Sequence, residues 1–129
     1  MNKKLLFEPF RLGDITLRNR IVMSAMTRSR ADYKTGLATD LHRQYYEQRA
    51  SAGLILTECM YVDWRGNGYP GAPGLTNKEQ AESWKKVTKA VHDKGGVIFA
   101  QLYHSGRIGH PNYTGLNPVG PSRVEIRDQ

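Results

Sequence analysis

The sequence is poor in cysteine and in long apolar runs, and both shortages restrict what the protein can be. Its single cysteine, Cys59, cannot form an internal disulfide, so nothing in the chain requires an oxidising compartment. The apolar residues after Lys3 and Lys4 stop at Glu8 and Pro9, which makes the run too short for a signal peptide or a membrane span. We therefore expect a soluble, cytoplasmic protein without a membrane partner.

Acidic residues are also in short supply. The chain has 12 Asp and Glu against 19 Lys and Arg, which gives a formal charge of +7. Such an excess can indicate a nucleic-acid partner, but here the basic residues are spread along the chain and form no stripe with interleaved aromatics. We expect no nucleic-acid partner, and a basic nucleic-acid-binding module stays an alternative that salt-dependent binding to DNA or RNA would support.

Apolar segments alternate with amphipathic ones along the chain. Two short runs flank Gly13 and Asp14, and this spacing predicts a tight β-hairpin of residues 10–12 and 15–17. Three near-continuous apolar segments then predict buried strands, and helices are expected between them. This order predicts right-handed crossovers and a parallel sheet, which is the α/β class. The expected strands are residues 21–25, 54–60 and 97–103.

The first expected helix covers residues 41–52. Asp40 is expected to cap its start, and a left-handed Gly53 is expected to stop it. Leu41, Tyr45 and Ala52 fall within one arc at 100° per residue, so we expect this arc to pack on the sheet.

The second expected helix starts near Thr76 and ends at Gly95 and Gly96. Thr76 and Glu79 have the spacing of a capping box. The apolar stripe of this helix is expected to consist of Ala81, Trp84, Val87 and Val91.

Polar residues gather after the carboxyl ends of all three expected strands, where ligands bind in parallel sheets and barrels. Taken singly, such residues also cap loops or satisfy buried backbone groups. Their convergence on one rim favours a ligand site. They are Ser24 to Thr27 after the first strand, Glu58 and Cys59 after the second, and Gln101, Tyr103 and His104 after the third.

Two other patterns suggest a dinucleotide site and a metal site, and we predict neither. Gly66, Gly68 and Gly71 spell G-x-G-x-x-G, but prolines interrupt the segment and no helix follows directly, so we interpret it as a rim loop that presents Tyr69. The histidines could suggest a metal site, but His42 and His92 are placed on helices away from the strand ends, and no carboxylate or thiol completes a set with His104 and His110. Metal binding is therefore not expected.

Several motifs occur in an order that resembles one protein family, the old yellow enzyme family of FMN-dependent ene-reductases. The resemblance runs from Leu6 to about Ser122 and implies the N-terminal portion of a (β/α)₈ TIM barrel, with a bottom hairpin, about three parallel strands and two helices. Because a whole barrel needs about 250 residues, residues 1–129 are expected to form one partial FMN-binding domain. The motifs are residues 6–9, 17–23, 26–31, 46–50, 68–74 and 101–107.

The resemblance assigns cofactor contacts to five residues. It implies that Ala25 and Met26 line the flavin ring and that Thr27 donates its hydroxyl to the carbonyl edge of the flavin. Gln101 would bond the pyrimidine side, and Cys59 would touch the flavin mainly through its backbone, without thiol chemistry. Donors at these edges favour the reduced flavin, which carries extra electron density there.

Two tyrosines, Tyr69 and Tyr103, would form part of the substrate wall. Tyr103 stands where many bacterial members of the family have tryptophan, and Ala25 stands where many have proline. We expect the cofactor type to survive both changes and the pocket shape to differ.

The resemblance implies an oxidoreductase in which NAD(P)H reduces FMN and the flavin passes a hydride to a small electron-poor alkene. The family's substrate-binding pair, its proton donor and its phosphate-binding loops would lie beyond Gln129, so no catalytic residue is expected within this segment. The alternative is a non-catalytic fragment or assembly piece that needs the missing barrel strands. Its unpaired strand edges would then favour self-association.

Overall fold

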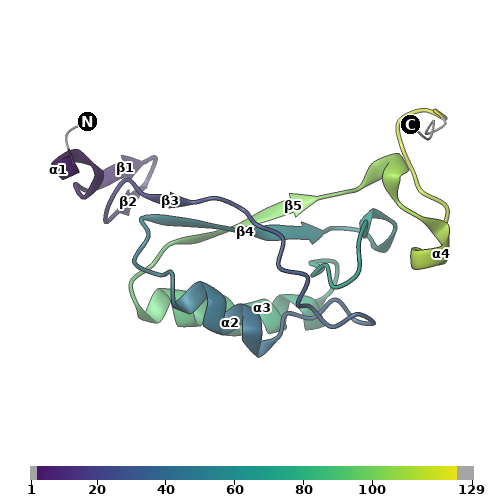
Figure 1. The fold of residues 1–129 in the computed structure, drawn as a ribbon, viewed down its shortest axis with the longest axis horizontal. Coiled ribbons are helices and arrows are strands. Elements are labelled where there is room, and N and C mark those ends of the chain that lie inside the picture. The colour runs from purple at the N-terminus through teal and green to yellow at the C-terminus, as the bar shows by residue number, and fades with distance from the viewer. Residues whose placement is uncertain (1–2, 125–129) are drawn as a thin grey trace.

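The computed structural model describes residues 3–124, which form two small sheets, two long helices and several short ones. Figure 1 shows three parallel strands above α2 and α3, with the β1–β2 hairpin at one end and α4 at the other. The elements are α1 (Lys3–Leu6), β1 (Phe10–Leu12), β2 (Ile15–Leu17), β3 (Val22–Met23), α2 (Asp40–Glu47), β4 (Leu54–Tyr61), η1 (Trp64–Gly66), α3 (Lys78–Asp93), β5 (Ile98–Tyr103), η2 (Gly106–Ile108) and α4 (Pro111–Thr114).

The predicted hairpin is confirmed. β1 and β2 pair antiparallel, with Leu12 opposite Ile15. Gly13 has a φ of 57°, the left-handed conformation that such a turn requires.

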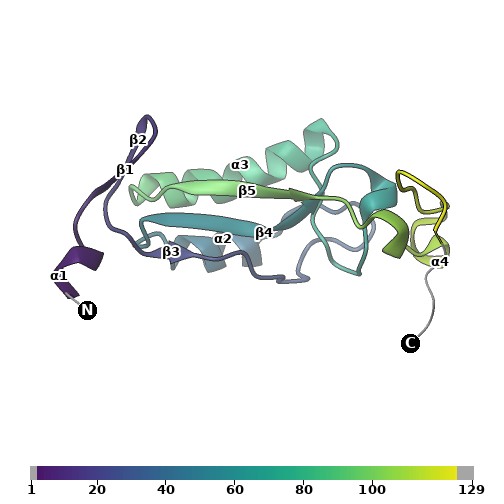
Figure 2. The same cartoon turned by 90° about the horizontal axis from the view of Figure 1, so that it is seen from above.

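The predicted parallel sheet is confirmed, and its strand order β3–β4–β5 follows the order of the chain. The prediction of its first strand was too long, because only Val22 and Met23 pair with β4. Beyond them the chain leaves the sheet, and the amide of Arg28 donates to the side chain of Glu58 instead of to a strand. Figure 2 shows the three strands side by side, with the helices on one face.

A β-bulge, which no sequence pattern predicted, interrupts the pairing of β4 with β5. Leu56 pairs with Phe99, whereas the next paired residue, Cys59, lies opposite Gln101, so β4 has one residue more than β5. The Thr57 hydroxyl fills the break, since it accepts the Gln101 amide hydrogen at 3.0 Å.

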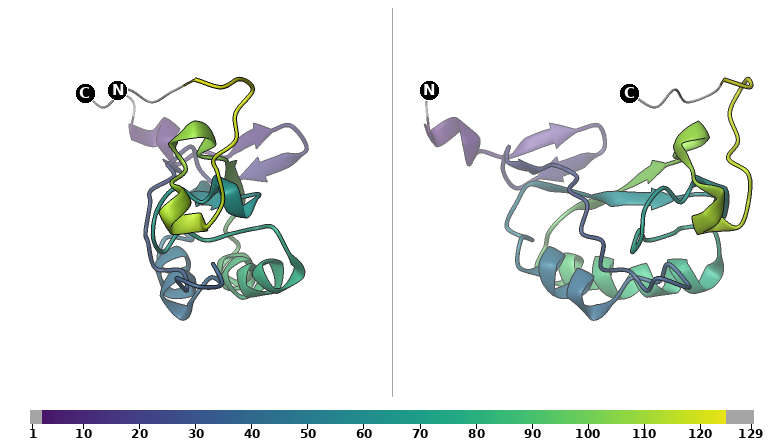
Figure 3. Two further views of the ribbon diagram at one scale, coloured as in Figure 1. Left: turned by 90° about the vertical axis from the view of Figure 1, so that its right-hand side faces the viewer. Right: turned by 45° about the vertical axis from the view of Figure 1, so that its right-hand side comes forward.

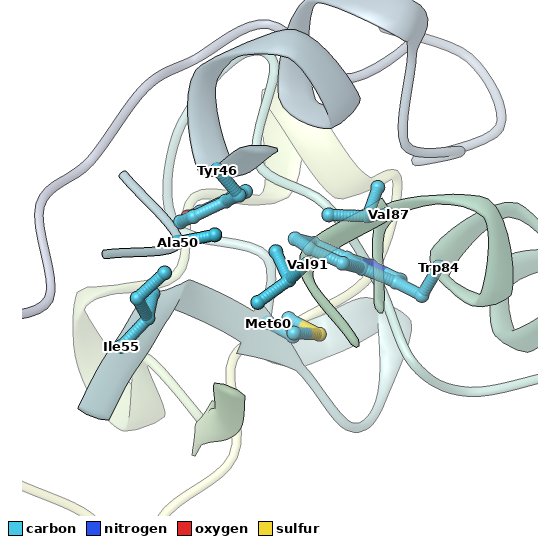
Figure 4. Close-up of a cluster of buried hydrophobic side chains, with 7 residues drawn as sticks. All are labelled: Tyr46, Ala50, Ile55, Met60, Trp84, Val87 and Val91. Atoms are coloured by element: carbon cyan, nitrogen blue, oxygen red, sulfur yellow. The ribbon is translucent and has the colours of Figure 1, made fainter. Parts of the chain in front are cut away.

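α2 and α3 lie side by side against the outer face of the sheet (Figure 3, left). The facing side chains of the two helices, Ala50 just after α2 and two residues of β4 form the main apolar core (Figure 4). Because of the bulge, Ile55 and Met60 both point into this core although they are five residues apart. The core consists of Tyr46, Ala50, Ile55, Met60, Trp84, Val87 and Val91.

The predicted packing face of the first helix was right in part. Tyr45 and Ala52 are partly buried and pack against the core, whereas Leu41 is 56% exposed. The fully buried side chains are those of His42, Tyr46 and Ala50. The helix also ends at Glu47, because the next residues form tighter turns with bonds from amide i to carbonyl i−3.

The predicted ends of α2 were also wrong. The N-cap is Thr39, and Asp40 is the first helical residue, with its carboxylate bonded to Arg43 and Gln44 on the surface. Gly53 is not left-handed. It is a glycine because a Cβ there would lie 2.0 Å from the Asn19 carbonyl oxygen.

α3 starts two residues later than predicted. Asn77 is its N-cap, and the Asn77 side chain accepts the Gln80 amide hydrogen at 2.9 Å. Thr76 lies outside the helix and donates both its amide and its hydroxyl to the Gln80 side chain. The predicted stripe is confirmed at Trp84, Val87 and Val91. The helix ends at Asp93, just before the predicted end at Gly95, whose φ is 68°.

Parts of the sheet that the two helices do not cover expose large apolar side chains. Val22 of β3 and Phe99 of β5 are exposed, and Leu102 at the edge strand β5 is 57% exposed. Within residues 3–124, no strand pairs with the outer edges of β3 and β5.

Candidate active site at the carboxyl end of the sheet

The predicted rim residues lie around the carboxyl ends of β4 and β5. Cys59 and Gln101 are paired neighbours in the sheet. Tyr103 ends β5, and Tyr69 reaches it from the loop between η1 and α3. The structure therefore brings four of the seven predicted site residues together in two contacting pairs.

Cys59 fixes the orientation of the Gln101 amide. The Cys59 Sγ lies 2.9 Å from the Gln101 Oε1. Burial raises the pKa of the Cys59 thiol, and the negative charge of Glu58 raises it further, so the thiol is neutral and acts as the donor. The Gln101 oxygen is thereby occupied, and the amide nitrogen has no protein partner within residues 3–124.

Tyr69 and Tyr103 form a stacked pair, with ring centroids 6.1 Å apart and planes inclined by 25°. The Tyr103 hydroxyl oxygen accepts the Gly68 amide hydrogen at 3.1 Å, which anchors the rim loop to β5. Burial raises the pKa of Tyr69 to about 12, so its hydroxyl stays protonated at neutral pH.

The segment after β3 carries the other three predicted residues. Ala25 is half-buried, whereas Met26 and Thr27 are exposed. The Thr27 side chain lies beside the Tyr69 phenol and opposes part of the rise in its pKa. The Tyr69 hydroxyl oxygen is buried and has no partner with ordinary hydrogen-bond geometry among the described residues, so the contact with Thr27 is a close approach and not a formed bond.

Sequence reasoning missed the most buried polar contact in this region. The Nε2 of His42 lies 3.1 Å from the Oε1 of Glu58, and both side chains are 0% exposed. The sequence predicts His42 on an exposed helix surface away from the strand ends, because the predicted packing face of that helix starts at Leu41. The repeat of His42, Tyr46 and Ala50 at four-residue spacing is the signal that would have found it.

The glycine-rich segment is a rim loop, as interpreted. Gly66 lies in η1, and a Cβ there would come 2.6 Å from the ring of His104. His104 is exposed, and its Nδ1 accepts the Gly106 amide hydrogen at 2.9 Å. In the described part of the chain, no three His, Cys, Asp or Glu side chains cluster closely enough to hold a metal ion. None of the helices there has the length and apolar character needed to cross a membrane.

Comparison with known proteins decides the family. The sequence pattern of the NADH:flavin oxidoreductase / NADH oxidase family matches residues 5–128. The chain belongs to this family. The flavin oxidoreductase hxnT of Emericella nidulans is 42% identical over 126 residues, which are 94% of this chain and 32% of that protein. A protein of Leishmania infantum named as a probable flavin mononucleotide-dependent alkene reductase is 38% identical over 124 residues, 95% of this chain and 34% of that one.

A solved structure of the same family has the same fold. The old yellow enzyme homologue of Zymomonas mobilis superposes with a TM-score of 0.89 at 46% identity, over 95% of this chain and 34% of that one. The resemblance to the old yellow enzyme family is therefore confirmed, and the fold is the N-terminal portion of a (β/α)₈ barrel. The chain spans about a third of the length of these relatives.

Proposed function

We propose that the rim of β3, β4 and β5 binds one edge of FMN in an oxidoreductase that uses NAD(P)H to reduce small electron-poor alkenes. One observation carries the proposal. The Gln101 side-chain oxygen accepts the neutral Cys59 thiol, which leaves the amide nitrogen free to donate to a ligand. The flavin and alkene chemistry named for two relatives supports it.

The residues at the rim fit the shape and polarity of a flavin. A flavin ring is flat, with apolar faces and polar edges, and it needs apolar contact on the face and donors at the edge. Ala25 and Met26 offer the apolar surface, whereas Thr27 and Gln101 offer the donors. The chemistry that FMN supplies is hydride transfer from NAD(P)H to the alkene, with a proton from an acid. Among the described residues, we assign none as that acid.

The donors at the rim tune this chemistry. A hydrogen bond strengthens as its acceptor gains negative charge, so the Thr27 hydroxyl and the Gln101 amide stabilise a reduced flavin more than an oxidised one. Cys59 contributes through its hold on Gln101 and through its backbone. Its raised pKa argues against a thiolate beside the cofactor.

The test uses a completed barrel, in which the full chain is joined to the part of the Zymomonas mobilis relative that follows the matched segment. This hybrid should purify with FMN and oxidise NADPH in the presence of 2-cyclohexenone. Its Thr27→Ala variant should have a more negative flavin midpoint potential, because it lacks a donor worth about 1.5 to 3 kcal/mol when the acceptor is charged. Flavin reduction by NADPH should slow, and reoxidation by the enone should slow less or become faster.

Thr35→Ala is a matched control for Thr27→Ala, because the Thr35 hydroxyl donates to Asp32 and accepts the Leu37 amide hydrogen on the surface. The control should leave the midpoint potential unchanged. A hybrid that folds without FMN would contradict the proposed function. Equal potentials and equal half-reaction rates in wild type and Thr27→Ala would contradict the role of Thr27.

Tyr103 is proposed to select the substrate and not to retain the cofactor. It lies two residues beyond Gln101, nearer the rim, and its ring packs on Tyr69. The Tyr103→Ala hybrid should keep its FMN content but change its relative turnover of bulky and small enones, as measured by kcat/KM for each. Loss of flavin with an unchanged substrate profile would show that Tyr103 belongs to the cofactor site.

The exposed apolar surface favours a second candidate for the chain by itself. Val22, Phe99 and Leu102 have no cover among the described residues, and the edges of β3 and β5 are unpaired there. On this reading the chain is an assembly piece that needs further strands to complete its site.

A further inference from the structure

We propose that Glu58 and His42 are positioning residues, which hold the peptide after Thr27 and thereby set where the Thr27 hydroxyl meets the flavin. The inference rests on the proposed function, because it concerns the same cofactor edge. Glu58 was expected among the rim residues, but its side chain is buried against α2. Glu58 and His42 both act through the loop that carries Thr27.

The Glu58 carboxylate has a polar neighbour at each oxygen. Its Oε2 accepts the Arg28 amide hydrogen at 2.9 Å. Its Oε1 lies 3.1 Å from the His42 Nε2, a close polar contact without ordinary hydrogen-bond geometry. The Arg28 amide belongs to the peptide bond that joins Thr27 to Arg28. The carboxylate therefore restrains the peptide plane directly attached to Thr27.

His42 presents a hydrogen to this carboxylate because of its second ring nitrogen. The His42 Nδ1 accepts the Thr39 amide hydrogen at 3.0 Å. An accepting Nδ1 carries no hydrogen, so the ring hydrogen lies on Nε2, opposite Glu58. The ring also contacts Trp84 edge-on, with centroids 5.6 Å apart, which fixes its plane within the core.

The backbone of Glu58 is fixed by the same helix. The Glu58 amide donates to the Tyr46 hydroxyl oxygen at 2.8 Å. Burial is the main cause that raises the pKa of Tyr46, so the phenol is neutral and stays packed in the core. Side chain and main chain of Glu58 are thus both held by the inner face of α2.

Other contacts hold the loop further from Thr27. The Arg28 guanidinium lies over the Tyr45 ring at 3.9 Å, and the Arg30 carbonyl accepts the Thr39 hydroxyl at 2.9 Å. Ser29 has a φ of 50°, a conformation that a residue with a side chain adopts only at a cost. Among these contacts, only the one with Glu58 is made at the peptide next to Thr27.

A buried carboxylate is costly unless every oxygen has a partner, so Glu58 is a poor choice for stability alone. A positioning role requires a group that accepts the Arg28 amide hydrogen on one side and tolerates the His42 Nε2 at close range on the other, and a carboxylate has an oxygen for each. Glu58→Gln keeps the size of the side chain but has to turn its NH2 group toward either the Arg28 amide or the His42 Nε2.

The experiment is a double-mutant cycle in the completed barrel. Glu58→Gln should weaken FMN binding about tenfold, shift the flavin midpoint potential and speed hydrogen exchange of the Arg28 amide. In the Thr27→Ala background, the same change should shift the potential much less, because Glu58 acts through Thr27.

His42→Gln is the second variant, for use if Glu58→Gln does not fold. It should weaken FMN binding, shift the potential and speed Arg28 amide exchange in the same directions but by smaller amounts. Glu47→Gln is the matched control, since Glu47 lies on α2 like His42 and its carboxylate pairs with Arg43 and Lys94.

Two outcomes would overturn the inference. Equal shifts in both Thr27 backgrounds would show that Glu58 acts on the flavin directly or only on stability. If the wild-type hybrid bound no FMN, the proposed function would fail, and the inference would be decided separately on the flavin-free protein by Arg28 amide exchange. Unchanged protection in Glu58→Gln would then overturn it, whereas faster exchange than in Glu47→Gln would support it.

Discussion

Expressed alone, the 129-residue chain should neither retain FMN nor reduce 2-cyclohexenone, and it should self-associate. The outer edges of β3 and β5 lack strand partners among the described residues, and apolar side chains such as Leu102 stand exposed beside them. Unpaired edges and exposed apolar surface are relieved most readily by contact with a second copy.

Cofactor binding should fail for a separate reason. In barrels of this kind, the phosphate of a ligand is often held by the loops after the last two strands, and charge-assisted bonds there supply much of the affinity. The rim described here offers donors to the ring edge and no phosphate loop of that type. A flavin held only at its edge should exchange freely with solvent.

Three measurements check this prediction. FMN fluorescence should show no saturable quenching by the chain, NADPH oxidation should not depend on enone, and light scattering should detect assemblies larger than a monomer. The completed barrel is the positive control for all three. A monomeric chain that binds FMN tightly and turns over enone would show that three strands suffice for the site.

Trp84→Ala should destabilise the completed barrel by about 3 to 5 kcal/mol, the usual cost of truncating a large core aromatic. The Trp84 ring lies between α2 and α3, where it contacts His42 and Tyr46. Its removal leaves a cavity at the junction of the two helices with the sheet. Chemical denaturation followed by circular dichroism measures the change.

Leu41→Ala provides the matched control, because Leu41 is also a large apolar residue of this layer but points to solvent. Its cost should be within about 0.5 kcal/mol. A large cost at Leu41 combined with a small cost at Trp84 would mean that α2 packs with the face first expected from the sequence.

The order of elements was predictable because it depends on local signals. The Gly13 turn, the apolar strands and the Trp84, Val87 and Val91 stripe each follow from a few neighbouring residues. The pairing of Cys59 with Gln101 was predictable only in outline, from the rule that parallel strands place their ends at one edge.

What escaped prediction depends on contacts between distant segments. Leu41 is more hydrophobic than His42, so hydrophobicity alone predicted the wrong residue on the buried side of α2. The partner of the buried His42 is Glu58, which is sixteen positions further along the chain. Gly53 was expected to be a helix stop, but its reason is the approach of Asn19 from another segment. Neither contact can be predicted from the residues next to it in the sequence.

The single extra residue in β4 has a consequence for how the two sides of the sheet depend on one another. A strand with strict alternation gives every second side chain to each side. Here Glu58 and Met60 contact the side of the sheet that the helices cover, whereas Cys59 contacts Gln101 on the opposite side. The Thr57 hydroxyl bonds the Gln101 amide where the strand pairing is interrupted. If the same residues paired without the bulge, a strand with Ile55 in the core would turn Cys59 toward the helices and Glu58 and Met60 toward the opposite side, so the tether of the Thr27 loop and the contact with the Gln101 amide would both be lost. The bulge thus lets one strand supply the helical side at both of its ends and still point Cys59 at Gln101.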